Sequence, residues 1–157
     1  ATFADNALKK AREAMLFTGL PALADDSGLA VDVLKGAPGV YSARYGGEGA
    51  DDAANNRKLL AEMREVPLDR RRAAFICAMA FVTPEGSERM FTGSIGGCIL
   101  YGERGRGGFG YDPLFLVDGL ERTMAELTLE EKNGISHRGQ ALRQFREYLE
   151  QRQQNLR

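Results

Sequence analysis

The sequence predicts an α/β domain with a central mixed sheet flanked by helices. Segments with apolar residues every three or four positions alternate with short, strongly apolar segments of strand length. The chain has 157 residues, and 43% of them are hydrophobic. This length and composition suit one domain with a sizeable core, so we expect residues 1–157 to form a single domain.

The composition argues against two classes of partner. Lys and Arg number 21 and Asp and Glu number 22, which gives a net charge of -1 and no overall attraction to nucleic acid or to a membrane. No apolar run approaches the roughly 20 residues of a membrane span, and no signal peptide is visible. The two cysteines, Cys77 and Cys98, lack the spacing of metal ligands, so we expect reduced thiols in a cytoplasmic protein.

The first predicted helix runs from Thr2, its N-cap, to about Phe17. Thr2 and Asp5 form a capping box, and Gly19 and Pro21 end the helix. Its expected inward stripe is Leu8, Ala11, Ala14 and Met15. Lys10 lies near that face, where periodicity alone favours a lysine whose stem packs on apolar surface and whose charge stays in water.

An acidic stretch follows the first helix. Asp25 and Asp26 precede Ser27 and Gly28, between an apolar run and a strand expected from Leu29 to Leu34. We expect a polar turn at which two strand-like pieces meet. Paired carboxylates there suit a hard cation such as Mg²⁺ that is shared with a phosphate. A solvated turn is the alternative, because Asp, Ser and Gly are common turn formers.

A glycine-containing loop and a helix come next. The loop, residues 36–47, carries Tyr41, Arg44 and Tyr45, and long loops with such residues are often functional. The alternative is that the tyrosines anchor the loop to the core. Asp51 or Asp52 caps the next helix, which is expected to reach about Met63 with Leu59 and Leu60 also inward.

A hairpin is predicted in the middle of the chain. Residues 73–82 form a strongly apolar strand, a turn follows at 83–86, and a second strand covers 88–100 with a possible bulge at Gly96 and Gly97. Three arginines, residues 70–72, precede the first strand. They are expected to be a solvated strand end, with phosphate contact as the alternative.

A second glycine-rich loop covers residues 102–113. Residues 105–110 match G-x-G-x-x-G, but a strand at 114–117 follows instead of the helix that a dinucleotide-binding site requires. Phe109 could stack on a base, and Asp112 could accept a hydrogen bond from a base N–H. A core Phe and a turn Asp are the alternative.

The C-terminal part is predicted to be helical. A capping box at Thr128 and Glu131 opens a short helix that ends near Gly134. Ser136 caps a last helix to about Gln153, with inward residues Ala141, Leu142, Phe145, Tyr148 and Leu149. His137 and Arg138 are unfavourable for the macrodipole at its N-terminus, which favours a ligand-donating role over a helix-stabilising one. A surface histidine is the alternative.

Five motifs in one order carry a resemblance over nearly the whole chain. They are Thr2-Phe3 with Asn6-Ala7, then residues 23–29, 36–45, 107–113 and 136–142. Together they resemble the inosine/xanthosine triphosphate pyrophosphatase family, which hydrolyses ITP, dITP or XTP to the monophosphate and pyrophosphate with Mg²⁺. The resemblance implies two lobes with a cleft between them and a homodimer.

The resemblance also implies roles for individual residues. Asp26 is the expected catalytic carboxylate, which binds the metal and acts as base toward water, and Asp25 supports it. The expected substrate-binding residues are Lys10, Ser27, Phe109, Gly110, Tyr111, Asp112, Lys132, His137 and Arg138. Among these, Lys10 contacts the phosphates, Phe109 stacks on the purine, and Lys132, His137 and Arg138 recognise the base.

The sequence departs from the family pattern at its start. The family has an upstream Ser/Thr-Gly-Asn-x-x-Lys phosphate loop and a metal-sharing Glu, and this sequence begins after both. We therefore expect an N-terminally incomplete domain whose own activity is impaired. The alternatives are a catalytically inactive protein that binds or senses purine nucleotides and, more weakly, a nucleic-acid-binding module.

Overall fold

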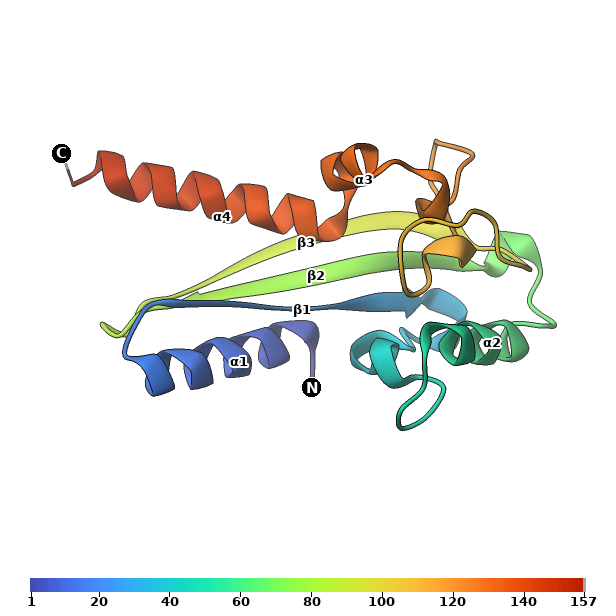
Figure 1. Cartoon of the computed structure of the whole chain (residues 1–157), viewed down its shortest axis with the longest axis horizontal. Helices are drawn as coiled ribbons and strands as arrows, with labels where there is room; N and C mark the ends of the chain where they lie inside the picture. Colours follow the sequence, from blue (N-terminus) through green and yellow to red (C-terminus); the bar gives the residue numbers. More distant parts are fainter. Residues whose placement is uncertain (157) are drawn as a thin grey trace. The chain divides into compact units, whose positions relative to one another are not determined.

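The computed structural model describes residues 1–156 (Figure 1). Within this range, four strands form one sheet in the order β1-β2-β3-β4, and β3 and β4 run antiparallel with Gly97 opposite Val117. The helices and strands are α1 (Phe3–Thr18), β1 (Ala22–Val31), α2 (Asp52–Glu62), β2 (Arg72–Val82), β3 (Glu88–Ile99), β4 (Phe115–Val117), α3 (Leu129–Ile135) and α4 (His137–Gln154). The predicted α/β class is confirmed.

The described chain separates into two compact units. The first unit contains Ala1–Ser27, Ile76–Ser94 and the C-terminal segment from Ile135, and the second contains Gly28–Phe75 and Ile95–Gly134. The single domain and the cleft that the sequence suggested stay predictions.

In the first unit, β2 is covered on both faces. Ala78, Ala80 and Val82 pack with Ala7 and Ala11 of α1. The alternate side chains Cys77, Met79 and Phe81 pack with Phe91 and with Ala141 of α4. Figure 1 shows α1 and α4 on opposite sides of the strands. Since successive side chains of a strand point to opposite faces, this double coverage explains why residues 73–82 are almost uniformly apolar.

The predicted caps of this unit are confirmed. Thr2 and Asp5 form the capping box of α1, and Ser136 Oγ accepts the N–H of Gly139 at the start of α4. Two predicted inward residues are wrong, because Ala14 and Leu142 are exposed. The reason is that the contacts of α1 and α4 are made by small residues, Ala7 and Ala11 in one and Ala141 in the other.

The acidic stretch is part of a strand, not a turn. β1 runs without interruption through Asp25, Asp26 and Ser27, and the predicted strand residues Val33 and Leu34 lie in a short 3₁₀ turn instead. Ala22 and Ala24 pack against the α1 cluster. This tertiary packing overrides the local turn preference of Asp, Ser and Gly.

The second unit has buried apolar residues of its own. Leu29, Leu59 and Met63 are fully buried, and the rings of Phe75 and Phe115 lie 4.5 Å apart between centroids. α2 begins after its N-cap Asp51, one of the two caps that the sequence allowed, and the Asp51 carboxylate accepts the N–H of Ala54. β3 continues through Gly97, where an added Cβ would lie 2.3 Å from the carbonyl oxygen of Leu116. Gly97 therefore reflects the close approach of β4 to β3 rather than an interruption of β3.

The middle arginine of the Arg70–Arg72 run is not at a solvated strand end. Arg71 is fully buried and donates hydrogen bonds to four backbone carbonyls, those of Met63, Val66, Ile99 and Leu100. Arg72 pairs with Asp118. A buried guanidinium has several donors, so it can hydrogen-bond to the carbonyls of separate chain segments and hold them together, which no local sequence pattern reveals.

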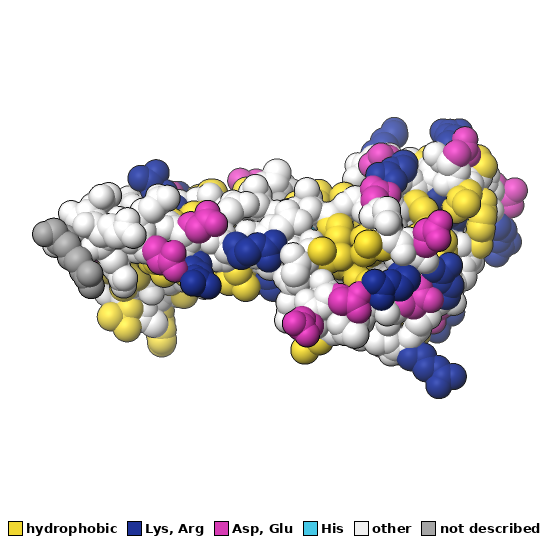
Figure 2. Space-filling model, turned by 90° about the horizontal axis from the view of Figure 1, so that it is seen from above, with side chains coloured by type: hydrophobic (Ala, Val, Ile, Leu, Met, Phe, Trp, Pro, Cys, Tyr) yellow, Lys and Arg dark blue, Asp and Glu magenta, His cyan; other side chains and the backbone are white. Residues whose placement is uncertain are grey.

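The surface agrees with the balanced composition. On the face drawn in Figure 2, the acidic and basic side chains of the described residues are interspersed rather than gathered by sign. Among residues 1–156, no helix combines the length and the apolar character that a membrane crossing requires.

Candidate functional site

Asp26 of β1 is held by two side chains of α1. Lys10 Nζ donates to Asp26 Oδ1 at 2.8 Å and to the backbone carbonyl of Asp25 at 3.1 Å, and Asn6 Nδ2 donates to Asp26 Oδ2 at 3.0 Å. The Asp26 side chain is 17% exposed, so its charge is paired and oriented but still reachable. Lys10, whose side chain is half exposed, is therefore an ion-pair partner of Asp26 at the surface.

The contact of Asn6 with Asp26 was not predicted from the sequence. Asn6 precedes Lys10 by four residues, so the two side chains share one face of α1. That spacing was the available signal, because side chains four residues apart on a helix are neighbours and can reach the same partner.

Asp25 is held by a different group of residues. Arg138 of α4 donates to Asp25 Oδ2 through Nε at 3.1 Å and Nη2 at 3.0 Å, and Ser27 Oγ donates to the same oxygen at 3.1 Å. The Cys77 thiol lies 4.0 Å from it. Burial raises the pKa of Cys77, which keeps the thiol neutral and able to donate. Three predicted site residues, Asp25, Ser27 and Arg138, thus meet.

The two carboxylates do not converge on one point. Asp26 contacts α1, whereas Asp25 contacts α4 and Cys77, which packs with α4. Alternation along a strand sends adjacent side chains to opposite faces, so the acidic pair that the sequence suggested is divided.

The donor set bears on the predicted metal. Residues 1–156 contain no group of three or more His, Cys, Asp or Glu side chains that could hold a metal ion. Mg²⁺ is commonly bound through one or two carboxylates, with the remaining ligands from phosphate oxygens and water. Asp26, reachable and next to the ammonium of Lys10, fits such a shared site.

A second cluster lies in the second unit and joins three predicted residues. Lys132 Nζ forms an ion pair with Asp112 Oδ2, and their side chains are 14% and 6% exposed. The same ammonium lies 4.3 Å from the centroid of the Phe109 ring, and Asp112 Oδ2 also accepts the N–H of Phe109 at 3.1 Å. Phe109 is 65% exposed, which excludes the alternative of a core phenylalanine.

The neighbours of Phe109 are fixed by other contacts. Gly110 donates its N–H to Asp52 and accepts from Asn56 through its carbonyl. Tyr111 is buried, and its hydroxyl donates to the carbonyl of Ser42 at 2.6 Å. The Tyr111 ring therefore lies in the core, and the substrate-binding role expected of this residue stays a prediction.

His137 opens α4 in the first unit and is partly buried. Its backbone packs closely on β3, because a Cβ added to Gly93 would lie 2.0 Å from the His137 carbonyl oxygen. The role expected of its imidazole stays a prediction.

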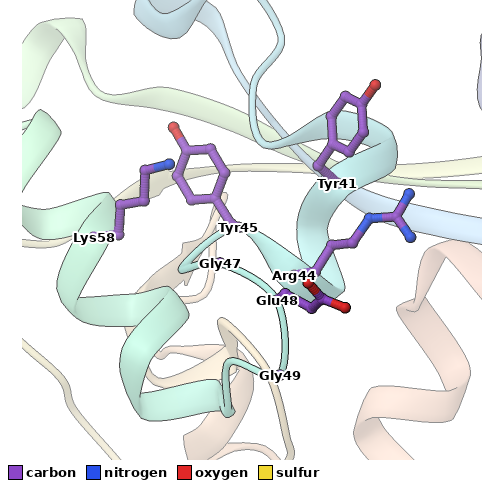
Figure 3. A pocket seen from close by; sticks show the side chains of 7 residues that line it. All are labelled: Tyr41, Arg44, Tyr45, Gly47, Glu48, Gly49 and Lys58. Carbon is purple, nitrogen blue, oxygen red and sulfur yellow. The ribbon is translucent and has the colours of Figure 1, made fainter.

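The loop that carries Tyr41, Arg44 and Tyr45 lines a pocket of about 580 Å³ (Figure 3). Arg44 lies over the Tyr41 ring at 5.5 Å and Lys58 over the Tyr45 ring at 4.3 Å from the centroid. The Tyr45 hydroxyl donates to Glu62 of α2, whereas Tyr41 is exposed. Tyr45 therefore anchors the loop, and Tyr41 does not. The pocket contains none of the predicted site residues.

Comparison with known proteins shows which family this chain resembles. The sequence model of the Ham1 family matches residues 1–148. A dITP/XTP pyrophosphatase of Geobacter sulfurreducens is 59% identical over 148 residues, which are 94% of this chain and 74% of that protein. One of Frankia alni is 60% identical over 147 residues, with 90% and 73% covered.

A solved structure also matches, that of the Staphylococcus aureus Ham1 protein. It superposes with a TM-score of 0.93 at 42% identity, and the match covers 97% of this chain and 78% of that one. Family model, close relatives and fold agree, and this chain belongs to the Ham1 family.

Proposed function

We propose that this chain hydrolyses deaminated purine nucleoside triphosphates (ITP, dITP and XTP) to the monophosphate and pyrophosphate, and so cleans the nucleotide pool. The observation that carries the proposal is the name dITP/XTP pyrophosphatase, which relatives 59% and 60% identical to this chain share. The side-chain clusters around Asp26 and around Asp112 supply groups that suit this chemistry.

The second unit supplies a binding surface for a 6-oxopurine. The exposed ring of Phe109 offers a face on which a purine can stack. Lys132 can donate to the 6-oxo group, and Asp112 can accept the adjacent ring N–H. Adenine carries an amino group and an unprotonated nitrogen at these positions, so it would set a donor against Lys132 and an acceptor against Asp112 and make neither hydrogen bond, which disfavours its binding. We assign His137 and Arg138 to base recognition as well. Guanine shares the 6-oxo group, so its exclusion depends on shape around the 2-amino group.

The first unit supplies groups for the phosphates and for water. We assign the ammonium of Lys10 to the phosphates and Ser27 to a further substrate contact. Asp26 acts as general base. The water oxygen forms a bond to phosphorus, the α–β anhydride bond breaks, and the water proton passes to the Asp26 carboxylate. Asp25 supports the arrangement by holding Arg138. Mg²⁺, held in part by Asp26, would neutralise charge on the triphosphate.

We also propose a homodimer in the cytoplasm. An apolar patch of three exposed side chains near the end of α1, Leu16, Phe17 and Leu20, supports an association surface. Light scattering of the wild-type chain and of Phe17→Ser tests this, since an interface at the patch predicts a smaller species for the variant.

The activity is tested by pyrophosphate release from ITP, XTP, GTP and ATP with Mg²⁺. We expect release from ITP and XTP in preference to GTP and ATP. Binding of ITP without release from any nucleotide would identify a binding or sensing protein instead. Steeply salt-dependent binding to oligonucleotides, without nucleotide hydrolysis, would identify a nucleic-acid-binding module.

A further inference from the structure

The loop that presents Phe109 is intrinsically flexible. Five of the nine residues from 102 to 110 are glycine. Glycine loses more backbone freedom on ordering than any other residue, so a ring on such a loop has no preferred direction unless other groups fix it. An exposed stacking surface therefore needs restraints on the backbone to either side of Phe109.

One restraint comes from the C-terminal side of the loop. Asp112 Oδ2 accepts the N–H of Phe109 at 3.1 Å, and the Phe109 carbonyl accepts the N–H of Asp112 at 3.2 Å. Gly108 has a positive φ, and a Cβ there would lie 2.2 Å from Asp112 Oδ2. These contacts hold the N–H of Phe109 but leave the next residue, Gly110, to be fixed separately.

Helix α2 holds Gly110 from both ends of the residue. Asp52 Oδ2 accepts the Gly110 N–H at 2.8 Å, and Asn56 Nδ2 donates to the Gly110 carbonyl at 3.1 Å. Asp52 and Asn56 are four residues apart, so they lie on one face of the helix. Gly110 has a φ of +59°, in the left-handed region that favours glycine.

Asn56 is a poor choice for stability alone. The residue is 3% exposed, and its Oδ1 is buried without a hydrogen-bond partner among the described residues. A buried unpaired acceptor is destabilising, and an apolar residue would fill this helix position without that penalty. Its Nδ2 has two acceptors, the Gly110 carbonyl and Glu103 Oε1 at 3.3 Å, which fixes the orientation of the amide.

We propose that Asp52 and Asn56 are positioning residues, which set the orientation of the Phe109 ring for stacking by gripping Gly110. This inference rests on the proposed function, because it assigns α2 a role in binding the same purine. Neither side chain needs to touch the substrate. Their effect on the reaction passes through Phe109.

A double-mutant cycle tests this path. Asp52→Ala is expected to raise KM for ITP about tenfold with kcat within about twofold, as loss of one hydrogen bond to a charged acceptor implies. In a Phe109→Ala background the same change is expected to alter KM by less than about twofold, because the ring it positions is gone. An equal effect of Asp52→Ala in both backgrounds would overturn the proposal.

The matched control is Asp51→Ala. It removes a neighbouring carboxylate and the N-cap of the same helix, but Asp51 contacts Ala54 and not Gly110. We expect Asp51→Ala to lower thermal stability without raising KM. A rise in KM like that of Asp52→Ala would mean that the start of α2 acts through general helix stability, which contradicts positioning. The KM of Asn56→Ala is interpreted only if that variant stays folded. The KM of Asp52→Ala alone decides whether the positioning proposal stands.

Hydrogen exchange separates this inference from the proposed function. The Gly110 amide is expected to exchange at least about tenfold faster in Asp52→Ala than in the wild-type chain, and to be unchanged in Asp51→Ala. If the wild-type chain releases no pyrophosphate, the proposed function fails. Faster Gly110 exchange in Asp52→Ala would still support the inference that Asp52 holds Gly110 in place. Unchanged Gly110 exchange in Asp52→Ala would show that Asp52 does not hold Gly110 in place, whatever the activity of the chain.

Discussion

The ion pair between Lys132 Nζ and Asp112 Oδ2 has both side chains largely removed from water, 14% and 6% exposed. Asp112 also accepts the N–H of Phe109, so one carboxylate oxygen joins the α3 lysine to the loop that presents the ring. The pair is therefore both a structural link and the polar part of the proposed base site.

Lys132→Met is expected to destabilise the fold. The change leaves the buried Asp112 carboxylate without its cation, and breaking a buried pair from one side costs about 3–5 kcal/mol. Denaturant unfolding measures the loss. The control is Lys58→Met, since Lys58 forms an exposed pair with Glu62 at 3.8 Å, and such pairs contribute less than about 1 kcal/mol. Equal losses in the two variants would show that Asp112 is not dependent on Lys132.

Phe109→Ala is expected to raise KM for every purine substrate by about tenfold, within the range of a lost base–aromatic stacking contact. Because the ring is 65% exposed, stability should change little. The control is Tyr41→Ala, which removes another exposed ring with a cation over it. An unchanged KM in Phe109→Ala would remove the ring from the proposed purine site.

Local signals predicted the elements, and long-range contacts decided the rest. The caps at Thr2, Asp51 and Ser136 were predictable because a cap depends on residues within one helical turn. The apolar pattern of residues 73–82 was equally clear. The buried position of Arg71 was not, because two of its four carbonyl partners, those of Ile99 and Leu100, lie 28 and 29 residues away in the sequence.

The site shows the same division. The family resemblance implied roles for Phe109, Asp112 and Lys132, and the structure brings them together. The turn expected around Asp25 and Asp26 was wrong, since turn-forming side chains lie in a strand when packing on either face outweighs local preference. Asp52 and Asn56 gave no signal as partners of Gly110, because more than fifty residues separate them in sequence.

Asp26→Asn is expected to lower kcat by at least about 100-fold while ITP binding remains measurable. A carboxamide keeps the shape of the side chain but cannot take the proton from water. Steady-state pyrophosphate release and direct ITP titration measure the two effects. Asp32→Asn, an exposed aspartate just after β1, is the control and should keep full turnover. Near-normal turnover in Asp26→Asn would show that another group is the base.

Gly93→Ala is expected to destabilise the chain by about 3 kcal/mol or more, in the range of severe overpacking. The added methyl would lie 2.0 Å from the His137 carbonyl oxygen and 2.8 Å from Cβ of Gln140, so α4 would have to move away from β3. Thermal unfolding measures the loss. Gly102→Ala has no neighbour within 4 Å of the new methyl and should change stability little. Similar melting temperatures for both variants would contradict the close packing of α4.

Asp118→Asn is expected to lower stability near neutral pH but not in acid. Arg72 donates to both carboxylate oxygens of Asp118, at 2.6 Å and 2.7 Å, and these hydrogen bonds hold the pKa of Asp118 below its ordinary value of 3.8. A carboxyl whose pKa is lower in the folded state contributes stability above the unfolded pKa. That contribution is lost as the pH falls through the folded value. Both side chains are half exposed, so water and salt screen the pair, and the difference should stay below about 1 kcal/mol.

Urea unfolding should therefore show a lower free energy of unfolding for Asp118→Asn than for the wild-type chain at pH 6. This gap should close below pH 3.8, as Asp118 becomes protonated in the wild-type chain. At pH 6 this difference in unfolding free energy should also shrink in 1 M salt, because the Debye length at that salt concentration is only about 3 Å. A gap that persists unchanged in acid would mean that the Asn side chain itself disturbs the packing beside Gly96, whose added Cβ would lie 2.8 Å from Asp118 Oδ2. The pH dependence thus separates the charge of Asp118 from its shape.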